Sequence, residues 1–440
     1  MDTAKRPDTQ SRSVLPLAPP LPPGGLATLM APQSARPTKR WRVAYLVSHP
    51  IQYQAPLLRW LEAHSAVDLT TLFLSDLSVG KFHDEGFGRD VDWSDVDLLS
   101  GYRHRFLEAR GKTDRLSLVR PFTRGIEAEL AKGEFDALWV HGYAHQANLR
   151  AIRAARRLGI PVLLRGESLL LGRREKGFRA WLRDRLVPHV LASVDGVLSI
   201  GTANRDFYRA HGVAPERIFS APYAVDNARF QRQATAAAAT REELRAELAL
   251  DPRRPVVLYA SKLSARKRPL DLVAAFHSLH RRSCAPRPYL LIAGDGPQRG
   301  EVEAAARRLE QELGEDCVRM LGFATQTELP RLYDLCDVLV LPSSYEPWGL
   351  VVNECMNAAR PVVVSDRVGS GLDLVDDGRT GRIFPHGNTD ALADALGDVL
   401  QSREHARALG RAALERVQSL DFNAVATGLE RALERLVPAQ

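Results

Sequence analysis

The sequence predicts an α/β fold of two Rossmann-like lobes, whose parallel sheets face each other across a cleft. Short apolar runs alternate with helix-length amphipathic stretches in both halves of the chain, a pattern typical of parallel sheets covered by helices. At 440 residues the chain is longer than one hydrophobic core usually serves. The alternation pauses over residues 223–250 and then restarts, which predicts two such sheets in tandem.

Each predicted strand is a short apolar run that a helical stretch follows. The first half contains RVAYLVS, LTTLFLS, ALWVHG, PVLLRG and GVLSIG. The second half contains PVVLYAS, YLLIAG, VRMLGF, VLVLPS and PVVVSD. In open sheets of this kind ligands bind beyond the carboxyl ends of the strands. We therefore look for site residues directly after each apolar run.

Four segments follow from this pattern. Residues 1–40 are rich in proline and lack a helical or strand period, so a disordered tail is predicted there. Residues 41–224 form the N-terminal lobe, and residues 225–420 form the C-terminal lobe. Residues 421–440 form a C-terminal helix that could pack back toward the N-terminal lobe.

The net charge of +7 is concentrated at the N-terminus, because residues 1–40 hold six Lys or Arg against two Asp. The rest of the chain is nearly neutral, so no nucleic-acid partner is expected. The four cysteines lie far apart without a Cys-x-x-Cys pair, which disfavours a zinc site and a disulfide framework. No apolar run approaches the roughly 18–20 residues of a membrane-spanning helix, so we expect a cytosolic protein.

The segment from Leu339 to Asp366 has the pattern strand, loop, helix, strand. The helix is predicted to begin at a Pro-Trp-Gly stretch, so that free backbone N–H groups and the positive end of the helix dipole face the cleft. Such a place suits an anion, in particular the diphosphate of a nucleotide. The predicted donor-binding residues here are Pro347, Trp348, Gly349 and Leu350.

Two glutamates flank the start of this helix. Glu346 lies on the loop before the helix and Glu354 lies inside it. A carboxylate accepts two hydrogen bonds at once, which suits the adjacent hydroxyls of a hexose or a ribose. The alternative is structural: Glu346 would complement the helix dipole, and Glu354 would be an exposed helix residue.

Other strand ends in the second half also suit a nucleotide diphosphate. Lys262 and Lys267 follow the first strand and could neutralise a leaving diphosphate, although a solvated basic loop is the alternative. Glycines end the next two strands, where the backbone must come close to a ligand. The candidates there are Gly294, Gly322 and the adjoining Phe323.

Together these motifs resemble retaining glycosyltransferase family 4, whose signature is Glu, seven residues, Glu, here Glu346 and Glu354. The family's basic pair is commonly Arg and then Lys five residues on. Lys262 and Lys267 hold those places, so the bidentate fork of the Arg is lost. The segment PYAVDNARF resembles the hinge between the family's lobes. The resemblance covers roughly residues 42–420 and implies the two-lobed GT-B fold.

The resemblance also implies a role for each residue. The N-terminal lobe would hold the acceptor, and the C-terminal lobe would bind the donor. Glu346 would hold the transferred sugar and Glu354 the ribose. Lys262 and Lys267 would bind the diphosphate, and the backbone near Gly322 would bind the base. The reaction would retain the anomeric configuration, with the acceptor hydroxyl attacking from the face of the leaving group.

The first half departs from the family, many members of which carry paired glycines after the first strand. This chain has Ser-His-Pro-Ile-Gln-Tyr there, and Arg-Gly-Glu-Ser where the family has a later His-containing loop. The first of these stretches resembles a branch of the family associated with surface polysaccharide assembly. The acceptor-side candidates are His49, Gln52, Tyr53, His141, Arg165 and Glu167.

The sequence thus predicts a hexosyltransferase-type enzyme that moves a sugar from a nucleotide-diphosphate sugar to a glycan or a lipid-linked acceptor. No cofactor and no essential metal are expected, because the two lysines and the helix N-terminus supply charge and no Asp-x-Asp motif follows a strand end. Two alternatives remain open: a nucleotide-sugar epimerase of the same fold, and a non-catalytic subunit that binds nucleotide sugar or lipid. A dinucleotide-dependent oxidoreductase is disfavoured, since no Gly-x-Gly-x-x-Gly follows either lobe's first strand.

The segment from Arg150 to Arg185 is strongly basic, with eleven Lys or Arg against three acidic residues. Within it, KGFRAWLRDRLVPHVL mixes basic with apolar residues, as helices at a membrane interface do. The sequence therefore predicts peripheral contact with an anionic membrane. The alternative is a solvated helix whose Phe178, Leu182 and Leu186 face the core of the N-terminal lobe.

Overall fold

The structure, a computed structural model, describes residues 40–84, 86–93, 96–110, 117–118, 120–171, 177–282 and 286–438; the side chains of 110 and 178–183 are outside this description. Residues Arg36–Gln440 belong to one compact unit, and only this unit is considered below. The tail predicted over residues 1–40 lies outside the described residues, apart from Arg40.

The first half of the described chain builds a parallel sheet of seven strands in the order β11-β10-β9-β8-β1-β2-β5. The inner strands are runs of buried apolar residues, as expected of strands that helices cover on both faces. The strands are β1 (Trp41–Val47), β2 (Val67–Phe73), β5 (Arg103–Phe106), β8 (Ala137–His141), β9 (Val162–Arg165), β10 (Gly196–Ser199) and β11 (Ile218–Ser220).

Strand β1 shows how the sheet separates two cores. Side chains alternate across a strand, so Val43 and Tyr45 face one side while Ala44 and Leu46 face the other. The first pair packs in a cluster with helices α1 and α15, and the second pair packs in a cluster with α2 and α3. Both faces of this sheet are therefore covered.

The second half builds a parallel sheet of six strands in the order β14-β13-β12-β15-β16-β17. These strands form the centre of one continuous apolar core. The strands are β12 (Val256–Ala260), β13 (Tyr289–Ala293), β14 (Val318–Gly322), β15 (Val338–Leu341), β16 (Val362–Ser365) and β17 (Gly381–Phe384).

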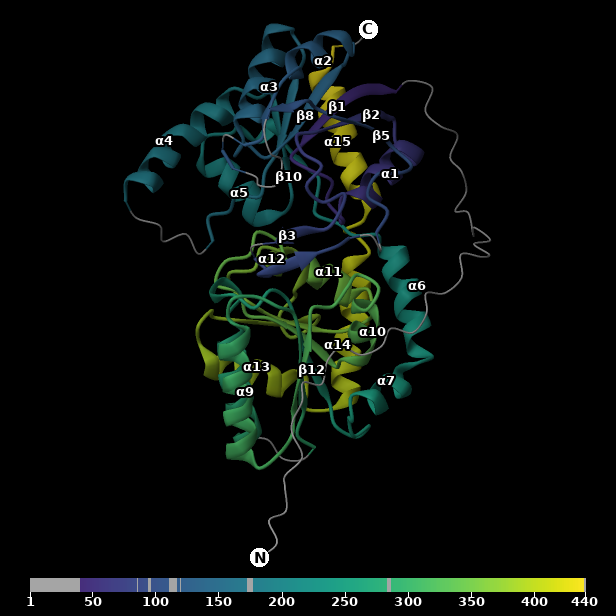
Figure 1. Cartoon of the computed structure of the whole chain (residues 1–440), viewed down its shortest axis with the longest axis vertical. Coiled ribbons are helices and arrows are strands. Elements are labelled where there is room, and N and C mark those ends of the chain that lie inside the picture. Colours follow the sequence, from purple (N-terminus) through teal and green to yellow (C-terminus); the bar gives the residue numbers. More distant parts are fainter. Residues whose placement is uncertain are drawn as a thin grey trace, which may run out of the picture. The chain divides into compact units, whose positions relative to one another are not determined.

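The helices connect successive strands of each sheet (Figure 1). Several begin with a side-chain cap; Asp226 and Asp421, for example, accept hydrogen bonds from backbone N–H groups of the first turns of α6 and α15. The helices of the first sheet are α1 (Ala55–His64), α2 (Ile126–Lys132), α3 (Gln146–Arg157), α4 (Phe178–Ala192) and α5 (Thr202–Ala210). The others are α6 (Asn227–Ala238), α7 (Arg241–Glu247), α8 (Pro269–Arg282), α9 (Arg299–Leu313), α10 (Leu329–Leu335), α11 (Leu350–Met356), α12 (Gly371–Leu374), α13 (Thr389–Val399), α14 (Arg403–Val417) and α15 (Phe422–Leu436).

Helix α15 leaves the second sheet and returns to the first. It packs on β10, β11 and α1, where it appears in yellow in Figure 1. Phe422, Val425 and Leu429 enter the apolar cluster of β1. Gly428 makes the contact possible, because a Cβ atom there would lie 1.8 Å from the backbone oxygen of Ser220.

The predicted fold class, two parallel α/β lobes, is confirmed, and each of the ten apolar runs forms a strand. The structure adds short strands that sequence reasoning missed. Strand β5 reads RHRF and β17 reads GRIF, and neither contains a continuous apolar run. Edge strands are covered less than central ones, so their sequence carries a weaker signal.

Candidate active site

Both sheets have their topological switch at the centre. The first strand of each sheet, β1 or β12, lies between strands whose connections run in opposite directions along the sheet. In such sheets the loops that follow the two central strands diverge and leave a crevice for ligands. His49 follows β1 and His141 ends β8, while Lys262 follows β12 and Glu346 follows β15. The sequence candidates therefore lie at both switch points.

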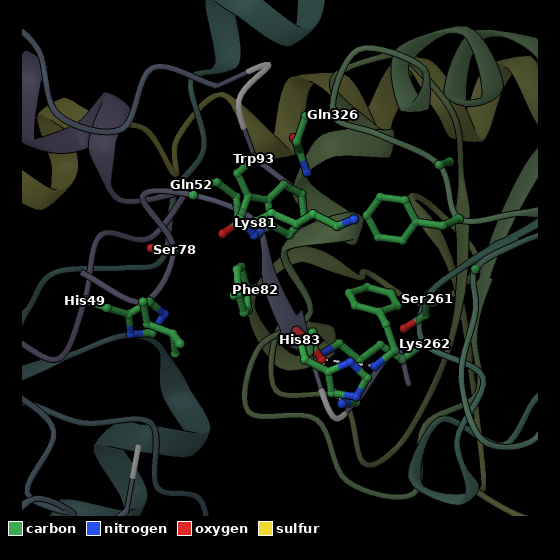
Figure 2. A pocket seen from close by; sticks show the side chains of 18 of the residues that line it. His49, Gln52, Ser78, Lys81, Phe82, His83, Trp93, Ser261, Lys262 and Gln326 are labelled. Carbon is green, nitrogen blue, oxygen red and sulfur yellow. Dashed lines mark hydrogen bonds and ion pairs between the residues drawn. The ribbon is translucent and has the colours of Figure 1, made fainter. Parts of the chain in front are cut away.

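A cavity of 1570 Å³ lies at the ends of β1 and β12 (Figure 2). Both lobes line it. Five of the predicted site residues contribute to the lining: His49, Gln52, Lys262, Gly294 and Phe323. The other predicted residues lie outside this lining: Tyr53, His141, Arg165, Glu167, Lys267, Gly322, Glu346, Pro347, Trp348, Gly349, Leu350 and Glu354.

Lys262 is bound across the cavity by an aspartate that sequence reasoning missed. Its Nζ lies 2.7 and 3.0 Å from the two carboxylate oxygens of Asp84, a contact drawn as a dashed line in Figure 2. Asp84 ends β3 (Phe82–Asp84), which pairs with β4 (Arg89–Val91) in a hairpin of the first lobe. Burial raises the pKa of Asp84, but hydrogen bonds and charge from Lys262 outweigh burial and lower it overall. The carboxyl group of Asp84 is therefore ionised at neutral pH.

The same hairpin contacts the ends of two further strands of the second sheet. The Phe87 ring meets the Phe323 ring edge-on at 4.9 Å between centroids. Arg89 places its guanidinium 5.2 Å from the centroid of Phe323 and 3.6 Å from the carboxylate of Asp295. Trp93 lies 6.0 Å from the same phenylalanine ring. The β3–β4 hairpin thus covers the strand ends at which the sequence predicts the nucleotide.

At two of these strand ends the backbone conformation itself requires or favours a glycine. A Cβ atom on Gly294 would lie 1.9 Å from the backbone oxygen of Ser261, so this glycine allows the loops after β12 and β13 to approach each other. Gly322 has a φ of +72°, a left-handed conformation that favours glycine. Its carbonyl accepts a hydrogen bond of 2.6 Å from the N–H of Gly294.

Glu346 and Lys267 form a buried ion pair. They are 8% and 9% exposed, and the Nζ of Lys267 donates to Oε2 of Glu346. Burial lowers the pKa of Lys267, and the charge of Glu346 opposes this effect. The backbone of Glu346 is fixed too, since its N–H donates to Arg367 at 3.0 Å and its carbonyl accepts from Gly369 at 2.9 Å. Lys267 is therefore directed at Glu346 rather than into the cavity.

Glu354 is buried, in contrast to the exposed helix residue of the structural alternative. Its side chain accepts a hydrogen bond of 2.5 Å from the hydroxyl of Tyr333. Burial raises the pKa of Glu354; the hydrogen bond from Tyr333 and the charge of Arg229 lower it by less. A buried carboxyl group with a raised pKa is a candidate for a functional site.

The acceptor-side candidates form a polar cluster in the first lobe. Tyr53 and Tyr223 both donate to Oε1 of Glu167, the former at 3.4 Å. His141 lies 3.8 Å from the same oxygen. Arg165 is 2% exposed and donates to backbone carbonyls. The sequence therefore pointed to residues that do lie together, although Tyr223 was not among them.

His49 stands apart from this cluster and lines the cavity (Figure 2). Its Nδ1 lies 2.9 Å from the hydroxyl of Ser48. Burial, together with the nearby His145 and His141, lowers the pKa of His49 to about 4. The imidazole is therefore neutral at physiological pH and can accept as well as donate a hydrogen bond.

Two family models match the chain in tandem. A glycosyl transferase 4-like domain matches residues 50–224, and a glycosyl transferases group 1 domain matches residues 240–416. The chain belongs to the GT-B glycosyltransferases. The resemblance to family 4 is thereby confirmed at the level of the two domains.

One curated relative of the chain is α-D-kanosaminyltransferase of Streptomyces kanamyceticus. The two sequences are 34% identical over an aligned region that covers 49% of this chain and 54% of the relative. The match spans about half the length of this relative and of D-inositol 3-phosphate glycosyltransferase of Nocardia farcinica. Among solved structures, sucrose-phosphate synthase of Thermosynechococcus elongatus has a TM-score of 0.64 at 22% identity, covering 90% of this chain and 99% of that one. HepE of Anabaena, solved with UDP and glucose, has a TM-score of 0.65 at 16% identity, covering 90% and 100%.

The structure describes only part of the basic segment from Arg150 to Arg185. Helix α4 is present from Phe178, but the side chains of Phe178, Arg179, Trp181, Leu182 and Arg183, and all of Lys176, lie outside the described residues. Leu186 is 53% exposed, so the alternative that Leu186 faces the core is wrong. No helix within residues 40–438, as far as they are described, is both long and apolar enough to cross a membrane.

The raised pKa of Glu354 predicts how stability depends on pH. A carboxyl group with a raised folded-state pKa stabilises the fold below its unfolded pKa, and this contribution is lost as pH rises through the folded pKa. Glu354→Gln keeps an acceptor for Tyr333 but removes the buried charge. We expect the difference between the Tm of Glu354→Gln and the Tm of wild type to be more positive at pH 8 than at pH 5.

Thermal unfolding at the two pH values measures this difference. Glu404→Gln, at an exposed glutamate of α14, is the matched control and should show no such change. A Tm difference for Glu354→Gln that is equal at both pH values would contradict the prediction.

Proposed function

We propose that this protein is a retaining glycosyltransferase that transfers a hexosyl group from a nucleotide-diphosphate sugar to an acceptor held by the first lobe. The observation that carries the proposal is the shared cavity, which Lys262 lines from one switch point and His49 and Gln52 from the other. A transfer between two substrates requires that their reacting atoms be held in contact. The UDP and glucose bound by the Anabaena neighbour support the choice of donor class.

The acceptor proposed is a glycan or a lipid-linked intermediate of surface polysaccharide assembly. Its hydroxyl attacks the anomeric carbon from the face of the leaving group. The bond from that carbon to the phosphate oxygen breaks while the bond to the acceptor oxygen forms. The acceptor's proton passes to the leaving phosphate oxygen, so the reaction requires no side-chain base.

Each donor-side residue has a proposed role. Lys262 neutralises the charge that grows on the diphosphate. Glu346 contacts the transferred sugar and Glu354 the ribose, and the backbone near Gly322 contacts the base. Lys267 is assigned a different role from the one that the resemblance implies, because its Nζ bonds the carboxylate of Glu346 and so orients that group.

The test begins with the nucleotide. UDP, GDP and ADP are compared by thermal shift, where a ligand at 100 times its Kd stabilises by about 2.7 kcal/mol. The corresponding nucleotide sugars are then incubated with a panel of glycan and lipid-linked acceptors. Acceptor-dependent release of nucleoside diphosphate supports the transferase. Conversion of the nucleotide sugar to its epimer without acceptor, and without net release of nucleoside diphosphate, indicates the epimerase. Binding without turnover indicates a non-catalytic subunit and would overturn the proposal.

Catalysis is expected to be independent of a divalent metal. Lys262 supplies a positive charge at the cavity, which can take the place of a metal ion on the diphosphate. Activity is measured after dialysis against EDTA and again after addition of Mg²⁺ or Mn²⁺. Loss of activity in EDTA with recovery on either metal would refute this expectation.

Peripheral contact with an anionic membrane is proposed for the segment from Arg150 to Arg185. Arg153, Arg156 and Arg157 on α3 are exposed, which supports an accessible basic surface. Each basic residue near anionic lipid contributes about 1 kcal/mol, and salt screens this attraction. Vesicle co-sedimentation should show salt-sensitive binding to anionic lipid that weakens when these three residues are changed to Gln. Binding that is equal for neutral and anionic vesicles would contradict the proposal.

A further inference from the structure

The segment that joins the two lobes is held by a buried arginine. The Nη2 of Arg165 donates to the carbonyls of Ala221 and Pro222 at 3.1 and 3.2 Å. Its guanidinium lies 4.7 Å from the centroid of the Tyr223 ring. Arg165 is 2% exposed, and such a buried cation is costly unless the contacts around it are well formed. The joining segment is thus fixed to the end of β9.

Glu167, two residues further along, holds the hydroxyl of Tyr223. The hydroxyl donates to Oε1 of the carboxylate. Burial raises the pKa of Glu167, but His141, Tyr223 and Arg165 together lower it below its ordinary value. The group is therefore ionised, and a hydrogen bond to an ionised acceptor is stronger than a neutral one.

The opposite side of Tyr223 contacts the loop that carries Glu346. The Tyr223 ring meets the Trp348 ring at 6.1 Å between centroids, with an angle of 66° between their planes. The Nδ2 of Asn353 lies 3.4 Å from the carbonyl of Tyr223, and the Oδ1 of Asn353 accepts a hydrogen bond of 2.8 Å from the indole N–H of Trp348. Tyr223 therefore contacts Glu167 in the first lobe and Trp348 in the second.

Trp348 has little freedom to move on its own. It is 3% exposed, and its carbonyl accepts a hydrogen bond of 3.1 Å from Ser370. A Cβ atom on Gly201, which precedes α5 in the first lobe, would lie 2.3 Å from the indole ring. Trp348 is two residues from Glu346 in the same loop, so the place of the indole constrains the loop that carries this carboxylate.

We propose that Tyr223 is a positioning residue, whose hydrogen bond to Glu167 sets the place of Trp348 and, through it, of Glu346 relative to the acceptor lobe. This inference rests on the proposed function for its kinetic consequence. The hydroxyl itself touches no reacting atom. A small displacement of a catalytic group lowers the rate of the chemical step more than it weakens substrate binding. The loss of the hydroxyl should therefore lower kcat rather than raise KM.

The experiment compares Tyr223→Phe, Glu167→Leu and their double variant with wild type, below the Tm of each. Tyr223→Phe keeps the ring on Trp348 but removes the hydroxyl. We expect kcat to fall about tenfold or more while the donor KM stays within about twofold. The double variant should be no slower than the slower single variant, because both changes remove the same hydrogen bond. Tyr102→Phe, which removes a buried hydroxyl that donates to Leu98 within the first lobe, is the control for stability alone.

A second measurement does not depend on turnover. The ¹⁹F resonance of Trp348 in 5-fluorotryptophan-labelled protein, assigned with Trp348→Phe, should shift or broaden in Tyr223→Phe but not in Tyr102→Phe. If the wild type transfers no sugar, the proposed function fails and this resonance alone decides the positioning role. A kcat of Tyr223→Phe within twofold of wild type, multiplicative effects in the double variant, or an unchanged Trp348 resonance each overturns the inference.

Discussion

Replacing Glu346 with Gln is expected to lower kcat by about 100-fold or more, with little change in the donor KM. Glycosyl transfer passes through a transition state in which the sugar ring carries positive charge. The carboxylate of Glu346 is buried and paired with Lys267, so a neutral amide removes a charge that solvent cannot replace. Steady-state kinetics with saturating acceptor separate kcat from KM.

The control for this prediction is Glu404→Gln on the exposed surface of α14, which should retain wild-type kinetics. Because Glu346→Gln also leaves the ammonium group of Lys267 without its partner, Glu346→Gln/Lys267→Met tests whether that group causes the loss. If kcat returns in the double variant, or if the single variant is as active as wild type, Glu346 does not act on the transferred sugar.

The contact between Lys262 and Asp84 predicts two opposite effects on donor binding. Lys262→Met is expected to raise the donor KM about tenfold or more, since a charge-assisted contact with the diphosphate is lost. Asp84→Asn is expected to lower the donor KM, because the carboxylate of Asp84 competes with the diphosphate for the same Nζ atom.

Titration of each variant with nucleoside diphosphate gives the Kd directly, at low salt and at high salt. Lys81→Met is the control. Lys81 also lines the cavity but belongs to the first lobe and is paired with Asp90, so this variant removes a lysine that is not assigned to the diphosphate. A rise in Kd for Asp84→Asn would mean that Asp84 supports the donor site instead of competing with it. An unchanged Kd for Lys262→Met would remove Lys262 from the diphosphate site.

The sheets could be predicted from the sequence because their strands are continuous apolar runs. Strands such as β8 and β12 are buried along almost their whole length, and burial on both faces requires such runs. The β3–β4 hairpin could not be predicted in this way. Its strands have three residues each and are partly exposed, so no apolar period marks them. Gly86 and Gly88, which flank Phe87, are the sequence signal that could have indicated a turn there.

The candidate site was predicted in its positions but not in its pairings. Strand ends locate Lys262 and Glu346, since the carboxyl ends of parallel strands lie at one edge of a sheet. Which residues neutralise them is decided by contacts between distant segments: Asp84 is 178 residues from Lys262, and Lys267 is 79 residues from Glu346. Charge patterns along a chain do not specify such contacts, so neither pairing could be predicted from the sequence.

The return of α15 to the first lobe means that the polypeptide passes between the lobes twice, and the two passages are bound to each other. Asn227, just after the first passage, donates to the carbonyls of Val417 and Leu420, just before the second, at 3.2 and 3.4 Å. The two connections therefore lie side by side and hold the lobes together at one place. A chain that ended before Phe422 would lose both the second connection and part of the first lobe's core.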